Sequence, residues 1–432
     1  MLDRYQTKQM QKIWDNQNKF RKHALIEAKH YVHSNSISEE SEKDLMVKIL
    51  SLSYDENRIK EIEEKTKHEF AAFLQYLKQN LGGEVEHFHI GLTSSDILDT
   101  TLAIQIDESL ELIIEAFFKF EKTILSKIKE HRKTLMIGRT HGVHAEITTF
   151  GLVLSSHFFE LQRAYVSLTE SIDAIRVGKL SGPVGTYSGT TIEAEQKVLE
   201  SFGLSPENCS TQVVCRDRYS KLLFALAQIS TAIERLATNI RNLHRTEIGE
   251  VKEGFAESQK GSSAMPHKQN PVLCESLCGL SRIVRNNVNL SLENCVLWNE
   301  RDMSHSSVER RIIPESLSIV EFMLIRINGI VSNMFVDSQK MLDNIDMTRG
   351  LCYSSTILNA LLKLGANSEE SYKAIQEISF MVHEDNKTTF FNELKKNEYI
   401  KQYLDDQKIE YLCSKNNLLN NIDKIYQKME YF

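Results

Sequence analysis

Proline is scarce in this sequence and is confined to one stretch of it. The chain of 432 residues has five prolines, all between Pro183 and Pro314, and the segments on either side have none. Proline breaks the interior of a helix more strongly than any other residue. Long stretches without it, with few glycines, therefore predict a mostly helical, all-α protein.

Other features are also missing, and each absence narrows the class of protein. No uninterrupted apolar run approaches the ~20 residues of a membrane-spanning helix, and segment 1–12 lacks the apolar core of a signal peptide. The net charge of -7 argues against general nucleic-acid binding, so an anionic ligand needs a local cationic site. The seven cysteines lack Cys-x-x-Cys spacing, and Cys274 and Cys278 fit small core residues of one helix better than a zinc site. We expect a cytoplasmic protein with reduced thiols and with neither membrane nor nucleic-acid partners.

Two segments have the apolar periodicity of long amphipathic helices. In the first, the apolar residues recur in steps of three and four at Ile106, Leu110, Ile113, Phe117, Phe120, Ile124 and Ile128. In the second, they recur at Leu222, Leu226, Ile229, Ile233, Leu236, Ile240 and Leu243. We expect each helix to exceed thirty residues and to belong to a bundle. Apolar flanks on the first helix also indicate association between chains.

Clusters of glycine and turn residues divide the chain. We expect an N-terminal helical domain over residues 1–92 and a central bundle of long helices over 93–342, with a loop at 254–271. A C-terminal helical domain then covers 343–432. Segment 178–189 is rich enough in glycine and β-forming residues to hold a small hairpin.

The most informative stretch is Gly261–Pro271, which reads Gly-Ser-Ser-Ala-Met-Pro-His-Lys-Gln-Asn-Pro. Gly261 and Pro266 exclude an ordinary helix interior. Two hydroxyls, the Lys268 ammonium and the Asn270 amide can hold a carboxylate beside a proton acceptor. Taken by itself, the composition favours a polar surface loop before a helix that begins near Pro271.

Two further polar clusters lie where helices are expected to begin or end. In segment 87–96, Thr93 or Ser94 can cap a helix with Asp96 in its first turn, and such a helix start can also bind an anion. In segment 138–146, His141 lies before Gly142, where the backbone can approach a ligand, and its side chain suits proton transfer. Capping and structural roles explain each cluster when it is considered alone.

Two more clusters combine arginines with hydroxyls or amides. Gln212 precedes the run Cys215–Tyr219, whose alternating charges at a helix start are typical of a solvated, self-paired cap. In segment 300–310, helical spacing places two guanidinium groups and two hydroxyls on one face, a set that suits a phosphate: Arg301, Ser304, Ser306 and Arg310. The alternative is a salt-bridged surface, in which the acids of the same segment neutralise the arginines: Glu300, Asp302 and Glu309.

Considered together, these clusters and Gly261–Pro271 resemble the signature of the fumarase/aspartase superfamily. Ala264 and His267 resemble the adenylosuccinate lyase family within it. The resemblance extends over residues 1–314 and is weaker in motifs beyond them. Its other matches are Asp3–Tyr5, Thr66–Glu69, Gly91–Ser94, Gly138–Glu146, Arg216–Arg218 and Glu300–Ser307.

The resemblance implies a carbon–nitrogen lyase that eliminates fumarate from adenylosuccinate to give AMP. It implies the same elimination from succinyl-aminoimidazole carboxamide ribotide in purine biosynthesis. No metal or organic cofactor is implied, because the substrate carboxylate accepts the electron pair. The family is a homotetramer whose central helices form a common bundle, with each active site assembled from three chains.

The resemblance also assigns roles to particular residues. Ser262 is the general base, on a loop that closes over the substrate, and His141 is the general acid, supported by His68. Lys268 stabilises the carbanion together with Asn270. The substrate contacts are Arg4, Tyr5, Lys67, His68, Glu69, His89, Thr93, Ser94, Gln212, Asn270, Arg301, Ser306 and Arg310. Three positions depart from the family pattern without removing a catalytic group: Gln269, Tyr219 and Ile147.

Two other interpretations remain open at this point. Another lyase of the superfamily, such as argininosuccinate lyase or a cycloisomerase, would not need the phosphate contacts implied at Arg4, Tyr5, Ser306 and Arg310. A helical scaffold without catalytic activity would not need Ser262, His141, Lys268 and Asn270 together.

Overall fold

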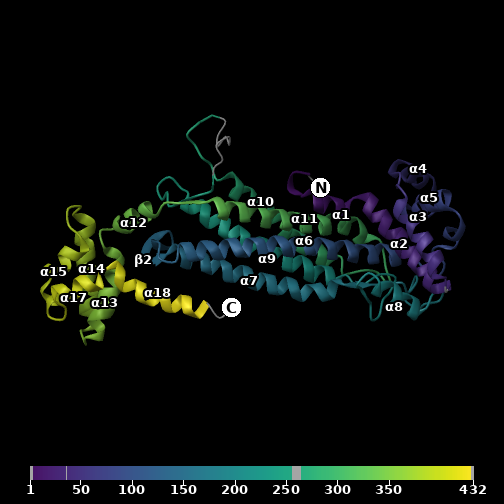
Figure 1. The fold of residues 1–432 in the computed structure, drawn as a ribbon. Helices are drawn as coiled ribbons and strands as arrows, with labels where there is room; N and C mark the ends of the chain where they lie inside the picture. The colour runs from purple at the N-terminus through teal and green to yellow at the C-terminus, as the bar shows by residue number, and fades with distance from the viewer. Residues whose placement is uncertain (1–2, 36, 255–263, 430–432) are drawn as a thin grey trace. The chain divides into compact units, whose positions relative to one another are not determined.

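Helices dominate the fold, as the scarcity of proline predicts (Figure 1). The computed structural model describes residues 3–35, 37–254 and 264–429. In that part of the chain, no helix has both the length and the hydropathy that crossing a membrane requires. Contacts between Cα atoms divide the chain into two compact units. The first comprises Met1–Phe120, Glu160–Ala237 and Glu275–Asn328, and the second comprises Glu121–Phe159, Thr238–Cys274 and Gly329–Phe432.

Short helices near the N-terminus form one hydrophobic core of the first unit. Phe20 and Phe73 stack with their ring centroids 5.5 Å apart, and Tyr54 is buried beside them. Side-chain caps set the helix starts, for example at Thr7 and Asp55, because they satisfy the first backbone N–H groups. The elements are η1 (Asp3–Tyr5), α1 (Lys8–Trp14), α2 (Asn16–Asn35), α3 (Glu39–Ser51), α4 (Glu56–Thr66), α5 (Glu69–Leu81) and η2 (Gly83–His87). Farther along the chain, this unit also contains β3 (Val177–Gly178), α8 (Ile192–Glu200) and β4 (Ser205–Pro206).

The long helices confirm the periodicity of the sequence. They are α6 (Ser94–Glu130), α7 (Phe150–Ile175), α9 (Asp217–Leu243), α10 (Val272–Glu293) and α11 (Ser304–Asn333). All fourteen apolar residues of the two predicted repeats are buried. The predicted length is correct for α6, which has 37 residues, and wrong for α9, which has 27. Helix α9 ends at Leu243 and is followed by a turn at Arg245–Gly249, in which Gly249 has a φ of 63°.

Side-chain contacts within the first unit show that the long helices lie side by side (Figure 1). The rings of Phe117 in α6 and Tyr165 in α7 stack with centroids 4.4 Å apart. The Ser281 hydroxyl of α10 donates to the Ser230 Oγ of α9 over 3.3 Å. Within this unit, α6 therefore packs against α7, and α10 packs against α9.

The second unit has a separate hydrophobic core that joins a β-hairpin to short helices. Ile137 and Ile147 of the hairpin are buried with Ile357, Ile378 and other apolar residues of the C-terminal helices. The elements of this unit are β1 (Leu135–Thr140), β2 (Val143–Thr149), β5 (Val251–Lys252), β6 (Phe335–Val336), α12 (Ser338–Asp346), η3 (Leu351–Tyr353), α13 (Ser354–Lys363), α14 (Ser368–Glu384), α15 (Phe390–Lys396), α16 (Glu398–Lys401), α17 (Asp406–Leu412) and α18 (Lys415–Met429).

The prediction of a hairpin at 178–189 is wrong. The hairpin is formed by β1 and β2, and β3 instead pairs in parallel with β4. His141 and Gly142 connect β1 to β2 with φ values of 54° and 80°, and two such residues favour a tight hairpin turn. In segment 178–189, side chains of α6 and α8 accept the backbone N–H groups that a hairpin would use, at Lys179, Leu180, Ser181 and Gly182.

Two glycines allow segments far apart in the sequence to touch. A Cβ added at Gly91 would lie 1.8 Å from the carbonyl oxygen of Gly189, and a Cβ added at Gly189 would lie 2.5 Å from the Cα of Gly91. Gly91 also has a φ of 79°. The segment that leads into α6 therefore depends on direct backbone contact with the segment before α8.

We predict that Gly91→Ala lowers the free energy of unfolding by about 3 kcal/mol or more, because steric overlap adds to the strain of a positive φ. Gly203→Ala is the matched control, because its φ is 70° and nothing lies within 4 Å of an added Cβ. The control has the strain alone, and we expect it to cost about 1 kcal/mol. Equal losses in urea unfolding of the two variants would contradict this account.

Candidate active site

The first unit contains a cavity of about 340 Å³ whose lining is rich in charge. Four cations line it, namely Lys19, Arg216, Arg301 and Arg310, and three carboxylates do so, namely Glu69, Asp99 and Glu309. The other lining residues include His23, His305 and Ser306. With neutral histidines, the lining has a net positive charge in a chain of net charge -7. This is the local cationic site that an anionic ligand requires.

The start of α6 lies beside this cavity, which Ser95 and Asp99 line. Helix α6 begins at Ser94, and the Asp96 carboxylate accepts the backbone N–H of Thr93 over 2.7 Å. An acid that reaches back to the residue before the helix satisfies a donor that would otherwise lack a partner. The predicted helix start, with Asp96 in its first turn, is therefore confirmed, and Thr93 and Ser94 are both half-buried.

A buried ionic network borders the same cavity. Arg216 donates through two nitrogens to the Asp99 carboxylate over 2.7 and 2.8 Å, and Arg216 Nε lies 3.3 Å from Glu309 Oε1. Burial works to raise the pKa of Asp99, but the adjacent guanidinium outweighs it and lowers that pKa. The interpretation of segment 215–219 as a solvated, self-paired cap is wrong at Arg216, because its carboxylate partners come from α6 and α11. Tyr219, one of the departures from the family pattern, is buried with its ring centroid 5.3 Å from this guanidinium.

Arg301 is held from several sides just before α11 begins. Its Nη1 donates to Gln212 Oε1 over 3.0 Å, and its Nε donates to His305 Nε2 over 3.4 Å. His305 Nδ1 lies 3.1 Å from Glu309 Oε2, so this ring nitrogen carries the hydrogen in that bond. The structure thus places two of the predicted substrate contacts, Gln212 and Arg301, in direct contact.

Arg310 and Lys19 share the carboxylate of Glu69. Arg310 Nη2 lies 2.6 Å from Glu69 Oε2, and Lys19 Nζ lies 2.9 Å from Glu69 Oε1. Burial would raise the pKa of Glu69, but these two cations and their hydrogen bonds lower it to about 2. Glu69 is therefore ionised at neutral pH and holds both cations at the cavity wall.

Three of the four residues predicted to form a phosphate-binding face in segment 300–310 lie at the cavity. Arg301, Ser306 and Arg310 line the cavity, although Arg301 precedes the helix. Among the described residues, no acid of the segment pairs with either arginine. Asp302 accepts the N–H groups of Trp298 and Ser304 instead.

The remaining predicted contacts of the first unit lie outside the lining of this cavity. Lys67 has a φ of 55° and ends α4, and His68 caps α5 by accepting the N–H of Ala71 over 3.2 Å. His89, with a φ of 72°, donates its backbone N–H and its ring Nδ1–H to the buried Glu27 carboxylate over 2.8 and 2.7 Å. The last two predicted contacts, Arg4 and Tyr5, lie in η1. Arg4 is exposed, and the ring of Tyr5 contacts that of Phe322 edge-on.

The second unit contains the predicted general acid. His141 lies in the tight turn between β1 and β2, where its side chain is exposed. Two hydrogen bonds, of 2.7 and 3.0 Å, join Arg139 in β1 to the buried Glu250 and so fix the strand that precedes the turn. Ile147, another departure from the family pattern, is a buried residue of β2. The exposed His141 therefore lies on a hairpin that is held by hydrogen bonds to a buried carboxylate.

The loop that carries the predicted base is described only in part. Ser262 lies outside the described residues, which resume at Ala264. The exposed Lys268 and the half-buried Asn270 precede α10, which starts one residue after Pro271, as predicted. Glu253 accepts the N–H groups of Leu273 and Cys274 over 3.1 Å, and so fixes the end of this loop.

Several residues of the site were not predicted. Some of them lie inside the sequence motifs, where their spacing from predicted contacts could have identified them: Asp96, Arg216, His305 and Glu309. Other buried or lining residues had no such signal, because their partners lie far away in the sequence: Lys19, Glu27, Asp99 and Lys179.

The sequence matches two family models. The model of the lyase family matches residues 3–285, and that of the adenylosuccinate lyase C-terminus matches residues 350–429. The second match falls in the part of the chain where the sequence motifs are weakest. Together they define the chain as a lyase.

Similar proteins give the family more narrowly. The adenylosuccinate lyase of Bacillus subtilis is 39% identical over 430 residues, which cover 99% of each chain. That of Helicobacter pylori is 38% identical over 438 residues, covering 99% of this chain and all of the relative. The chain belongs to the adenylosuccinate lyase family.

Solved structures show the same fold at lower identity. A fumarate lyase from Mesorhizobium sp. BNC1 matches with a TM-score of 0.87 and 22% identity, covering 98% of this chain and 99% of the other. The 3-carboxy-cis,cis-muconate lactonizing enzyme of Pseudomonas putida matches with a TM-score of 0.86 and 21% identity, covering 95% and 93%. The same fold therefore occurs in proteins whose names denote different reactions.

His23 lines the cavity, and its protonation affects the stability of the folded protein. It is buried, and its Nδ1 lies 2.8 Å from Thr101 Oγ1. Burial, followed by the positive charge of Lys19, lowers the pKa of His23 from 6.5 to about 3. Between these values the unfolded chain binds a proton that the folded chain does not, so acidification through this window favours unfolding.

We predict that lowering the pH from 6.5 to 5 removes about 1.5 kcal/mol of stability through His23. His23→Gln keeps a polar group for Thr101 and lacks this titration, so its urea midpoint should fall less over the same range. The exposed His383 gives the control variant, His383→Gln, which should follow the parent protein. Parallel pH profiles for the parent and His23→Gln would refute the assignment.

Proposed function

We propose that this chain eliminates fumarate from adenylosuccinate to give AMP, and from succinyl-aminoimidazole carboxamide ribotide. The observation that carries the proposal is identity of 38 to 39% to adenylosuccinate lyases over almost the whole length of both chains. The cationic cavity of the first unit agrees with a substrate that has two carboxylates and a phosphate.

The reaction needs a base, an acid and a site for developing negative charge. The base removes a proton from the succinyl CH2 group, and the electron pair moves into the neighbouring carboxylate. The pair then forms the carbon–carbon double bond of fumarate while the carbon–nitrogen bond breaks, and the acid protonates the leaving nitrogen. Because the doubly charged carboxylate must be stabilised, fixed cations and N–H donors contribute most to the rate.

Ser262 is the proposed base and His141 the proposed acid. A serine hydroxyl is a weak base at neutral pH, so it requires a nearby cation and the exclusion of water. Lys268, six residues after Ser262, is the proposed cation and, with Asn270, the clamp of the carboxylate. His141 suits the acid because an imidazolium can donate a proton to the leaving nitrogen and the hairpin presents its side chain to solvent.

The residues of the first unit are proposed to bind the substrate. Ser306 and Arg310, with Arg4 and Tyr5, are proposed to hold the phosphate. Thr93, Ser94, Gln212 and Arg301 are proposed to contact the succinyl and base portions, and Lys67, His68, Glu69 and His89 to complete the site. Arg301, Ser306 and Arg310 line the same cavity, which supports their assignment to one substrate site.

The proposal includes a compartment and a partner class. A purine nucleotide substrate and seven cysteines without paired spacing suit an enzyme of the cytoplasm. The net charge of -7 disfavours nucleic acid as a partner, so the nucleotide is bound as a small molecule.

We predict that the purified protein converts adenylosuccinate to AMP, followed by ultraviolet absorbance, and does not turn over argininosuccinate or malate. Ser262→Ala and His141→Gln should each reduce kcat by roughly 10²- to 10⁴-fold, because each removes a proton-transfer group. His383→Gln is the control and should keep kcat within about twofold of the parent. Absence of turnover by the parent would refute the function, and full activity of Ser262→Ala would refute the base.

A homotetramer with shared active sites is also proposed. Large apolar side chains are exposed on four long helices of the first unit, at Phe118, Val166, Phe224 and Ile325. Apolar surface of this kind on a bundle favours association between copies of the chain.

Shared sites predict complementation between inactive variants. If Ser262 and His141 of one site come from different chains, equal mixing of the two variants by dissociation and reassociation should restore activity to about a quarter of the sites. Sedimentation should give a tetramer for each variant and for the mixture. A mixture that stays inactive while it reassembles would show that one chain supplies both residues.

A further inference from the structure

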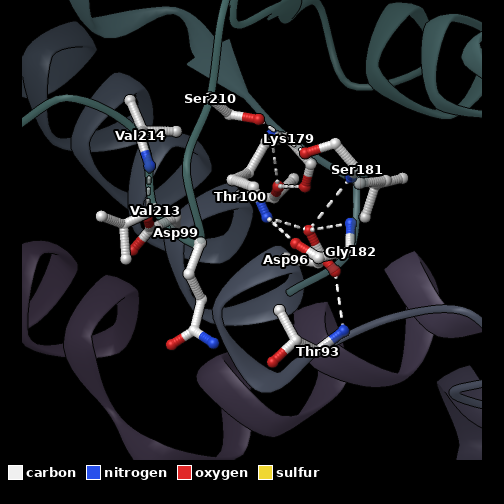
Figure 2. Close-up of polar contacts among 12 residues, drawn as sticks. Thr93, Asp96, Asp99, Thr100, Lys179, Ser181, Gly182, Ser210, Val213 and Val214 are labelled. Atoms are coloured by element: carbon white, nitrogen blue, oxygen red, sulfur yellow. Dashed lines mark hydrogen bonds and ion pairs between the residues drawn. The ribbon is translucent and has the colours of Figure 1, made fainter. Parts of the chain in front are cut away.

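A fully buried ion pair lies at the start of α6. Lys179 Nζ contacts Asp96 Oδ1, and neither side chain has any exposed surface (Figure 2). Lys179 Nζ also donates to the carbonyl oxygen of Gly182 over 3.2 Å. Neither residue has a role in the proposed chemistry.

Asp96 collects donors from two segments that lie far apart in the sequence. It accepts the N–H of Thr93 over 2.7 Å, that of Ser181 over 3.1 Å and that of Gly182 over 3.3 Å. Figure 2 shows these groups and Lys179 converging on the one carboxylate. The segment that contains Thr93 is thereby tied to residues 179–182.

The same side of α6 also holds a third segment. The Ser181 and Ser210 hydroxyls lie 2.6 Å apart, and Asp99, one turn after Asp96, accepts the N–H of Val214 over 2.9 Å (Figure 2). Gln212 lies between these two attachment points. The first two turns of α6 therefore fix both Thr93 and the segment that carries Gln212.

The stability of the fold alone does not explain a fully buried ion pair. Removing two charges from water costs several kcal/mol per ion, and apolar residues of similar volume often replace such a pair without loss of stability. Asp96, however, has oxygen acceptors for three backbone N–H groups, which an apolar side chain lacks. The pair thus defines the positions of backbone segments.

We propose that Lys179 and Asp96 are positioning residues for the succinyl end of the substrate, an inference that rests on the proposed function for the roles of Thr93 and Gln212. Lys179 pairs with Asp96 and orients its carboxyl group, and Asp96 holds Thr93 and the 179–182 segment. Neither side chain touches the substrate. Loss of the pair should therefore weaken recognition of dicarboxylate more than recognition of the nucleotide.

The test uses the double variant Asp96→Asn/Lys179→Met. It removes both charges together, so no unpaired charge remains buried, and the introduced amide offers one oxygen where the carboxylate offers two. The matched control is Glu207→Gln/Arg218→Met, which removes another ion pair of the first unit, with an N–O distance of 2.6 Å. Circular dichroism and the thermal midpoint establish that both variants fold.

Two measurements decide the outcome. In hydrogen exchange without ligand, amides of residues 91–98 and 179–185 should exchange faster in the Asp96/Lys179 variant than in the parent and the control. In kinetics, the KM for adenylosuccinate and the inhibition constant of fumarate should rise roughly tenfold, because misplaced contacts lose their orientation. The inhibition constant of AMP should stay within about twofold, because the cations that face a phosphate are untouched.

Unchanged exchange in both segments would overturn the proposal, as would equal rises in the constants for fumarate and AMP, which indicate general loosening. A parent protein without turnover would refute the proposed function instead. The exchange measurement uses no substrate, so it still decides whether the pair positions these segments.

Discussion

Two carboxylates one turn apart, Asp96 and Asp99, organise the start of α6 and the segments around it. Each is buried, each faces one cation, and each also accepts backbone N–H groups from segments distant in sequence. A buried carboxylate is tolerated only where its charge and its lone pairs are matched. The fold must therefore bring Lys179 and Arg216 to α6, together with the backbone N–H groups of Ser181, Gly182 and Val214.

Ion pairs with carboxylates hold the cations that line the cavity of this negatively charged protein. Glu69 is shared by Lys19 and Arg310, and Glu309 lies between Arg216 and His305. Lys19, Arg216 and Arg310 each have a carboxylate within 4 Å, so these three cations are held in place before any ligand arrives. Preorganised charge of this kind favours an anionic group without the cost of ordering flexible side chains.

The fold alone does not determine the reaction. Structures that match with TM-scores of 0.86 and 0.87 at 21 to 22% identity bear names of different activities. A shared bundle of long helices can support several sites, and the residues in the loops and at the helix ends decide which chemistry follows. In this chain three residues proposed for the site, Thr93, His141 and Lys268, each lie next to a helix end or a turn.

Patterns visible in the sequence were sufficient to predict the helical class, the buried faces of α6 and α9, the helix start at segment 93–96 and the family. These depend on local spacing and on motifs, which one chain displays directly. The three-dimensional contacts were needed to show that β1 and β2 form the hairpin, that Arg216 is buried, that Lys179 pairs with Asp96 and that Glu27 holds His89. The partners of Arg216, Lys179 and Glu27 lie far away in the sequence, where no local periodicity reveals them. A buried charge gives no signal in sequence until the fold shows which groups neutralise it.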